Sequence, residues 1–329
     1  MLSNLINPHD FVVLAEKVRH EGLDKVFAKL GRGNLTRVKK SWEHTESPAT
    51  NWWDIPAVIT RCNRLITGSA SCDPSSYVCT KYLKDKRQLH ALSLGCGTGH
   101  RELRWAETGC FTRIDAFDIS VERIEYARKR SSEHSYGHIL RYQIANVHEV
   151  EASDESYDVI LAEGILHHLS PLAGILSRIR RFLKPDGFFV INDFVGPSRF
   201  QWTERQLEIV NGLLSLLPHE YRKRWKTGSV KRKVYRPGRL AMMLNDPSEA
   251  AESSKILPLV SEIFEIVEFR EYGGTVLHLL FNRIAYNFVS EDDRTRRFLD
   301  LCFEVEDALL ASNQIDSDFV FLVCRKKRM

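Results

Sequence analysis

The amino-acid sequence predicts an α/β fold in which a mostly parallel sheet carries helices on both faces. Short, continuously apolar runs alternate with helix-compatible segments between residues 89 and 193. Such runs are typical of strands that are buried on both faces. The first run ends in a glycine-rich turn with a helix-compatible segment directly behind it, and the second run ends in an acidic residue, Asp118. Ligands of such folds lie at the carboxyl ends of the strands.

Length and composition allow about two domains, or one large domain with insertions, in 329 residues. The 43% hydrophobic and 27% charged content is ordinary for a globular protein, and the formal net charge of +4 says little about partners. We predict no stable membrane insertion and no signal peptide. The seven cysteines are scattered and form no CxxC pair, so neither a metal site nor a disulfide framework is predicted, and a reducing cytoplasm fits best.

An N-terminal helical cap is predicted over residues 1–88. Asp10 begins a first apolar periodicity that ends near residue 31. Asp54 is the expected cap of a helix with Pro56 in its first turn and Gly68 at its end. Asp73 opens another helix through residue 82. These helices are too small to bury much by themselves, so they are expected to pack on the sheet or to cover the site.

The glycine-rich turn carries glycines at positions 95, 97 and 99. Glycine tolerates positive φ and lets a ligand approach the backbone. Asp118 follows about 20 residues later at the tip of the second strand, where a carboxylate can accept both ribose hydroxyls of an adenosine. A dinucleotide fingerprint would need glycine at position 100, where the chain has His100. The alternative interpretation is that the glycine turn and Asp118 are incidental features of an ordinary α/β domain.

The run L-x-L-G-C-G-T-G at residues 92–99 resembles the first motif of the class I S-adenosylmethionine-dependent methyltransferases. The resemblance extends over about residues 89–193 and the C-terminal strands. It implies a Rossmann-like sheet whose last strand is antiparallel, and S-adenosylmethionine as cofactor. It also implies a set of cofactor-binding residues at the strand ends: Gly95, Cys96, Gly97, Gly99, Asp118, Ile119, Asn146, Val147 and Glu163.

The third strand, 142–145, is followed by Asn146, where many members of that family carry an acidic residue that binds the adenine amino group. The carbonyl oxygen of Asn146 or the N–H of Val147 is expected to replace it. The helix before this strand is predicted over 121–131.

The fourth strand, 157–162, leads into a segment that resembles the family's fourth motif, which lies beside the transferred methyl group. A hydroxyl acceptor needs a base with a pKa near the working pH, and histidine meets that need. His167 and His168 are therefore predicted as catalytic, together with Asp193 at the end of the fifth strand. The alternative is that the two histidines only shape the loop. Glu163 is expected to position the methionine part of the cofactor.

A helical insertion for acceptor recognition is predicted over about 195–262. Thr203 caps a helix there, with Gln206 completing a capping box, and Asp246 begins another helix. Residues 222–239 form a basic stretch without acidic residues. This stretch is interpreted either as a solvated face or as a surface for an anionic acceptor.

The motifs at 196–202, 246–250 and 272–278 resemble a subgroup of bacterial sugar and secondary-metabolite methyltransferases. Arg199, Tyr272, His278 and Trp53 are the expected acceptor contacts. Trp53 has a second interpretation, as an anchor of the N-terminal helices on the core, and an aromatic face there would also stabilise a sulfonium. Helices between the last strands are expected to form part of a lid or a homodimer face.

The main prediction is methyl transfer from S-adenosylmethionine to a small-molecule acceptor, at oxygen. The acceptor is expected to be a sugar, a lipid-linked molecule or a secondary metabolite. One alternative is an RNA methyltransferase that uses residues 222–239, although no RNA-binding module is recognisable and nucleic acid is not the expected partner. A second alternative is a cofactor-binding scaffold without catalysis. The methyltransferase domain is placed at residues 89–329.

Overall fold

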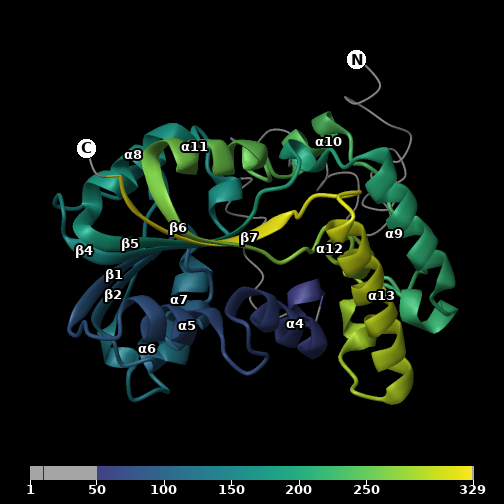
Figure 1. The fold of residues 1–329 in the computed structure, drawn as a ribbon, viewed down its shortest axis with the longest axis horizontal. Helices are drawn as coiled ribbons and strands as arrows, with labels where there is room; N and C mark the ends of the chain where they lie inside the picture. Colours follow the sequence, from purple (N-terminus) through teal and green to yellow (C-terminus); the bar gives the residue numbers. More distant parts are fainter. Residues whose placement is uncertain (1–9, 11–49, 328–329) are drawn as a thin grey trace.

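The computed structural model describes Asp10 and residues 50–327, without the side chains of Leu244 and Asn245. Its described part contains a seven-stranded sheet with the order β3-β2-β1-β4-β5-β7-β6 (Figure 1). The first five strands are mutually parallel, and β7 is antiparallel to both β5 and β6. The predicted α/β class and the antiparallel last strand beside the fifth are confirmed. The strands are β1 (Leu89–Leu94), β2 (Phe111–Asp118), β3 (Leu140–Ile144), β4 (Tyr157–Glu163), β5 (Leu183–Phe194), β6 (Phe264–Glu271) and β7 (Phe319–Lys326).

Helices cover both faces of this sheet (Figure 1). The longer ones are α4 (Pro56–Thr67), α5 (Pro74–Tyr82), α6 (His100–Glu107), α7 (Val121–Ser131), α8 (Leu172–Phe182), α9 (Glu204–Leu216), α10 (Arg239–Asn245), α11 (Ile256–Ile263), α12 (Leu277–Phe281) and α13 (Asp293–Ala311). Short 3₁₀ turns are η2 (Trp52–Asp54), η3 (Gly137–Ile139), η4 (Val147–Glu149), η5 (Leu166–His168), η6 (Ser198–Phe200), η7 (His219–Arg222), η8 (Ser253–Lys255) and η9 (Ala285–Phe288). The predicted helix over 10–31 lies outside the described residues, apart from Asp10.

The hydrophobic core has two layers because successive side chains of a strand point to opposite faces. In β4, Val159 and Leu161 pack with the helices α4 to α7, whereas Ile160 and Ala162 pack with α8 and α11. All four side chains are fully buried. The continuous apolar runs read from the sequence are therefore strands covered on both faces.

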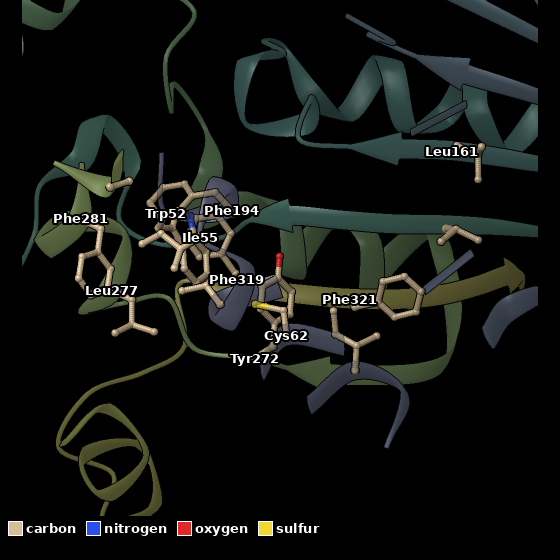
Figure 2. Packing of buried hydrophobic residues seen from close by; sticks show 14 of the residues in the cluster. Trp52, Ile55, Cys62, Leu161, Phe194, Tyr272, Leu277, Phe281, Phe319 and Phe321 are labelled. Carbon is tan, nitrogen blue, oxygen red and sulfur yellow. The ribbon is translucent and has the colours of Figure 1, made fainter. Parts of the chain in front are cut away.

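The described part of the N-terminal region packs directly on the sheet. Figure 2 shows Trp52 beside Phe194 and Phe319, with Ile55 next to them. The ring centroids of Trp52 and Phe319 are 5.0 Å apart, and Trp52 is 1% exposed. This packing brings the segment before α4 to the carboxyl end of β5.

The ends of the two N-terminal helices are partly as predicted. Gly68 ends α4 with a φ of 84°, and Asp73 caps α5 by accepting the N–H groups of residues 75 and 76. The prediction that Asp54 caps α4 is wrong, because Ile55 is the N-cap residue. The carboxylate of Asp54 instead accepts the backbone N–H groups of Thr50 and Asn51.

Two predicted features of the insertion differ in the structure. Thr203 accepts the N–H of Gln206, as expected for a cap, but the Gln206 side chain donates to the carbonyl oxygen of Thr275 and to Asp318 instead of closing a capping box. Asp246 does not begin a helix. Its carboxylate accepts the N–H of Ser248 in a turn, and α11 starts only at residue 256. Short polar side chains favour such local hydrogen bonds over helix continuation.

The basic stretch at 222–239 is not a uniformly solvated face. Lys231 is 6% exposed, and its ammonium donates to the carbonyl oxygens of Leu279, Leu280 and Asn282 at the end of α12. Burial lowers the pKa of Lys231 well below its usual range. Arg236 donates to the carbonyl oxygen of Trp202. Part of this stretch therefore holds the insertion together. In the part of the chain that the structure describes, no helix is both long and apolar enough to cross a bilayer.

Candidate active site

The turn after β1 has the backbone geometry that its glycines permit. Gly95, Gly97 and Gly99 have φ values of 64°, 55° and 74°. The N–H of Gly97 donates to Asp118 Oδ2 at 2.9 Å, and Ser120 donates to Oδ1 at 2.8 Å. A Cβ on Gly99 would lie 2.5 Å from the Tyr142 hydroxyl, so Gly99 serves close packing. The turn and the tip of β2 are thus fixed to each other.

A cavity of about 280 Å³ opens beside this turn. Asp118 and Ile119 line one part of it, and Asn146 and Val147 line another. The side-chain oxygen of Asn146 accepts the N–H of His148, while its amide donates to Glu149. Asn146 therefore uses its side chain to hold its own turn. The predicted adenine contact through that oxygen stays a prediction.

A second cavity, of about 480 Å³, adjoins the first. Gly95, Arg123, Gly164 and His168 line both cavities. The second cavity is lined by aromatic residues and by residues with polar groups. The aromatic residues are Trp52, Trp53, Phe194, Phe200 and Phe319, and the polar ones include Cys96, Gly97, Arg101, His167, Asn192, Asp193, Glu249 and His278.

A histidine–aspartate pair lines the second cavity. His167 Nδ1 and Asp193 Oδ1 are 2.5 Å apart. Asp193 is 1% exposed, and its carboxylate also accepts the backbone N–H groups of Ile165, Leu166 and Phe194. These contacts fix the carboxylate, which in turn fixes the imidazole. His167 Nε2 is then the nitrogen available for proton transfer.

Burial and neighbouring charges shift the pKa values of His167, His168 and Glu249. Burial disfavours the imidazolium of His167, but the carboxylates of Asp193 and Glu249 outweigh burial, and the pKa of His167 is raised. Burial, together with the His167 charge, lowers the pKa of His168 well below its usual range. Burial raises the pKa of Glu249 to about 7. Glu249 therefore exchanges protons near neutral pH, and its carboxylate helps His167 to hold a proton.

Glu249 reaches the site from a segment far along the chain. His167 Nε2 and Glu249 Oε1 are 3.8 Å apart. Residues 247 and 248 line the first cavity and Glu249 lines the second, so the segment 246–252 lies across both. We call this segment the strap. Its Ala251 N–H donates to the carbonyl oxygen of His167 at 3.2 Å.

Arg199 holds the strap in place. Its guanidinium donates to the carbonyl oxygens of Pro247 and Glu249, at 2.7 and 3.2 Å, and its own N–H donates to the carbonyl oxygen of Ala250. Glu252 adds a fourth anchor by accepting the N–H of Leu172. Arg199 lines neither cavity. The structure thus places the predicted acceptor contact Arg199 behind the strap, where it positions Glu249.

Of the other predicted acceptor residues, two line the second cavity and one does not. Trp53 and His278 line the second cavity. His278 Nδ1 lies 3.0 Å from the carbonyl oxygen of Gly274, and burial lowers the pKa of His278 to about 4, so its ring is neutral with Nε2 as the acceptor atom. Tyr272 is 1% exposed and its hydroxyl donates to Asn192 Oδ1 at 2.6 Å. Tyr272 thus supports Asn192 from behind the cavity.

Glu163 also lies outside both cavities. Its carboxylate accepts the indole N–H of Trp105 at 3.0 Å, and its carbonyl oxygen accepts a hydrogen bond from Arg101. Gly164 lines the cavities in its place. The predicted role of Glu163 in positioning the cofactor stays a prediction, and Arg101 is a cavity residue that the sequence analysis did not single out.

Glu249 is the main site residue that the sequence analysis missed. His167, His168 and Glu249 present donor atoms within 4.8 Å of one another. The two histidines are adjacent in sequence, but the carboxylate is about 80 residues away and its approach depends on Arg199. No local spacing marks such a group, and the sequence analysis predicted no metal site.

Comparison with known proteins decides the family. A family model described as a methyltransferase domain matches residues 85–245. Malonyl-[acyl-carrier protein] O-methyltransferase from Halalkalibacterium halodurans is 30% identical over 132 residues, which cover 36% of this chain and 46% of that protein. Residues 85–245 are therefore a methyltransferase domain, of the class I S-adenosylmethionine-dependent type that the fold also shows.

A second relative agrees with this methyltransferase assignment, and a solved structure has the same fold. The 27-O-demethylrifamycin SV methyltransferase of Amycolatopsis mediterranei is 26% identical over 130 residues, 38% of this chain and 47% of that protein. The chain thus spans about half the length of these relatives. The structure of geranyl diphosphate C-methyltransferase from Streptomyces coelicolor, in complex with Mg²⁺, geranyl diphosphate and S-adenosyl-L-homocysteine, has a TM-score of 0.50 at 10% identity. It covers 90% of this chain and 100% of that one, and it shows the fold.

The first cavity fits the cofactor that this methyltransferase family uses. Asp118 offers a carboxylate at the tip of β2 for the ribose hydroxyls, and Ile119, Ala145 and Val147 offer apolar surface for the base. The adjoining second cavity carries Gly97 and Arg101, where the charged methionine end would lie. The predicted cofactor, S-adenosyl-L-methionine, is therefore consistent with the donor groups of this site.

Proposed function

We propose that this protein transfers the methyl group of S-adenosylmethionine to an oxygen atom of a small-molecule acceptor. The observation that carries the proposal is the His167–Asp193 pair, which lines a cavity that adjoins the cofactor cavity. An imidazole held at Nδ1 by a buried carboxylate is a general base at Nε2. A hydroxyl acceptor is the substrate class that needs such a base.

The second cavity favours a small acceptor. Its volume of about 480 Å³ lies in the range of ordinary small-molecule sites, about 300–1,000 Å³. Trp53, Phe200 and Phe319 give it aromatic surface, which suits an acceptor with an apolar or planar body. The names of the two relatives describe methyl transfer at oxygen, to a malonyl carrier protein in one and to a rifamycin in the other. The rifamycin name supports a secondary-metabolite acceptor for the present chain.

The residues of this chain perform three tasks in the proposed reaction. S-adenosylmethionine supplies a methyl group on a sulfonium, which an oxygen nucleophile accepts without a redox step. His167 Nε2 takes the proton of the acceptor hydroxyl, and Asp193 holds the imidazole in position and stabilises its positive charge. The residues that line the second cavity hold the acceptor so that its oxygen lies close to the reacting carbon. The carboxylate of Glu249, 3.8 Å from that nitrogen, also stabilises the imidazolium by its charge.

The test is transfer of labelled methyl groups to a panel of hydroxylated small molecules by the His167→Gln variant. We expect a loss of about 10²–10⁴-fold in rate, the usual contribution of a general base. Affinity for S-adenosylmethionine should change little. The matched control is His90→Gln, at an exposed histidine of β1. Unchanged transfer by His167→Gln would overturn the base assignment, and cofactor binding without transfer to any acceptor would favour the scaffold alternative.

The geometry of the basic stretch at 222–239 does not support the RNA-methyltransferase alternative. No side chain of residues 222–239 lines either cavity. Lys231 and Arg236 in that stretch are occupied with backbone carbonyl oxygens. The anionic acceptor, the homodimer and the cytoplasmic location stay predictions.

A further inference from the structure

The histidines of η5 and the carboxylate of the strap form a group of metal-ligand type. His167, His168 and Glu249 each offer one donor atom, and these atoms lie within 4.8 Å of one another. Ligands on one ion at about 2.0–2.2 Å lie roughly 3–3.5 Å apart, so only small side-chain rotations separate the group from a coordinating arrangement. All three side chains line the second cavity.

The group has the supporting contacts that metal-binding histidines require. His167 Nδ1 is bonded to Asp193 Oδ1, which leaves Nε2 facing Glu249 at 3.8 Å. A carboxylate on the second nitrogen of a ligating histidine fixes the ring and raises its basicity. His168 Nδ1 lies 3.4 Å from the Ser248 hydroxyl, on the strap itself. The backbone hydrogen bonds of Arg199 to the strap fix the position of Glu249.

The donor set selects the class of ion. Two imidazoles and one carboxylate suit a divalent transition ion such as Zn²⁺, Fe²⁺, Mn²⁺ or Co²⁺, whereas Mg²⁺ and Ca²⁺ prefer oxygen ligands alone. Three protein ligands leave at least one coordination position open, as in catalytic rather than structural sites. That position faces the second cavity, because all three residues line it.

We propose that His167, His168 and Glu249 form a binding site for one divalent transition-metal ion, whose open position holds the acceptor's oxygen atom. Binding of the ion needs no methyl transfer, so this part is independent of the proposed function. The role of the open position rests on the proposed function. An ion lowers the pKa of a coordinated hydroxyl, and the proton then leaves to solvent.

The ion and the general base are alternative occupants of the same nitrogen. His167 Nε2 can hold either the ion or the acceptor's proton. Asp193 supports both, because it orients the ring in each case. With the ion bound, the hydroxyl is activated by coordination. Without it, His167 removes the proton.

The test is titration of the full-length, metal-free protein with Co²⁺, monitored by visible absorption. We expect one Co²⁺ per chain with the intense bands of a four- or five-coordinate ion. His168→Gln and Glu249→Gln should each weaken Co²⁺ binding at least tenfold, and Asp193→Asn should weaken it about 10–100-fold. The matched control is His278→Gln, an imidazole in the same cavity but outside the group. It should bind Co²⁺ within twofold of the parent.

Two further measurements make the outcome decisive. Circular dichroism and S-adenosylmethionine binding show that each variant is folded, and Glu249→Asp, which keeps the carboxylate, should retain part of the affinity if Glu249→Gln does not fold. Addition of acetohydroxamate, an oxygen chelator, should shift the Co²⁺ bands by occupying the open position.

Equal Co²⁺ affinity in the parent and both group variants, or the absence of stoichiometric binding, would overturn the site. Bands that acetohydroxamate leaves unchanged would overturn the open position. A protein that binds Co²⁺ but transfers no methyl group would contradict the proposed function alone.

Discussion

Asp193 connects several parts of the site through one buried carboxylate. It accepts two backbone N–H groups of the turn after β4 and the N–H of Phe194 at the end of β5, and it contacts His167. Its charge offsets the burial that would otherwise disfavour the His167 imidazolium. Because His167 accepts a proton only when it is neutral, the rate of methyl transfer should rise with pH through the raised pKa of His167.

The Asp193→Asn variant tests this pH dependence. Removal of the carboxylate charge lowers the pKa of His167, so the midpoint of the pH–rate profile should move to lower pH. The limiting rate should fall by about 10²-fold or more, because the imidazole loses its orientation. The control is Asp300→Asn, at an exposed position of α13. A midpoint that stays in place or moves to higher pH would contradict this explanation.

Asp118 is expected to bind the cofactor through the same carboxylate that fixes the glycine turn. Asp118→Asn should weaken S-adenosylmethionine binding by at least tenfold, because an amide cannot accept at both positions and the hydrogen bond from Gly97 is weakened as well. Isothermal titration calorimetry measures the change. Glu122→Gln, in the exposed first turn of α7, is the control. Parent-like affinity in Asp118→Asn would show that the ribose assignment is wrong.

At the scale of elements, the strap depends on a few hydrogen bonds to distant segments. The Arg199→Ala variant removes two bonds from a charged donor to the carbonyl oxygens of Pro247 and Glu249. Such bonds contribute about 1.5–3 kcal/mol each, so backbone amide exchange in the strap should accelerate at least tenfold. The acceptor KM should rise, since Glu249 is no longer held.

Hydrogen-exchange mass spectrometry of the strap measures this change. Arg205→Ala, at an exposed position of α9, should leave the exchange of the strap unchanged. If Arg199→Ala exchanges as slowly as the parent, Arg199 does not hold the strap, and its earlier interpretation as an acceptor contact becomes the better one.

The elements with strong local signals could be predicted from sequence. The strand runs, the α7 helix, Gly68 and Asp73 are set by apolar periodicity and by capping chemistry that the local sequence contains. The strap could not be predicted, because Asp246 makes a turn where a helix cap was expected. The contact between Glu249 and His167 depends on Arg199, which lies on a third segment. Long-range contacts of this kind leave no spacing pattern in the chain.

The surroundings of single residues depend on long-range contacts in the same way. Tyr272 and Lys231 were read by residue type, as an acceptor contact and as part of a charged face. The structure buries both because segments far apart in sequence, near Asn192 and at the end of α12, offer them hydrogen-bond partners. The glycine turn and Asp118 could be placed together from the sequence because both belong to a short, fixed strand–turn–helix unit.

At the scale of the whole molecule, buried carboxylates link stability to pH. Glu102 is 2% exposed and accepts the Ser93 hydroxyl, and burial raises its pKa from 4.5 to about 7. The folded state therefore holds a proton that the unfolded chain releases above about pH 4.5. The stability from this proton is fully present below that pH and is lost as the pH rises through 7.

Glu102→Gln should remove most of this pH dependence. A shift of this size corresponds to about 3 kcal/mol in the free energy of unfolding between pH 4.5 and 8. Urea denaturation of the parent and the variant at several pH values measures it. Glu107→Gln, exposed on the same helix, should keep the parental dependence. Equal pH slopes for the parent and Glu102→Gln would contradict the assignment.

The central claim is that a small molecule accepts the methyl group in the cavity beside His167 and Asp193. The most direct measurement is transfer of a labelled methyl group from S-adenosylmethionine into a host extract, followed by separation into polar small molecules, lipids and nuclease-sensitive polymer. We expect label in the small-molecule or lipid fraction, with a loss of about 10²-fold or more in His167→Gln. Label in the nuclease-sensitive fraction would contradict it and would favour an RNA acceptor.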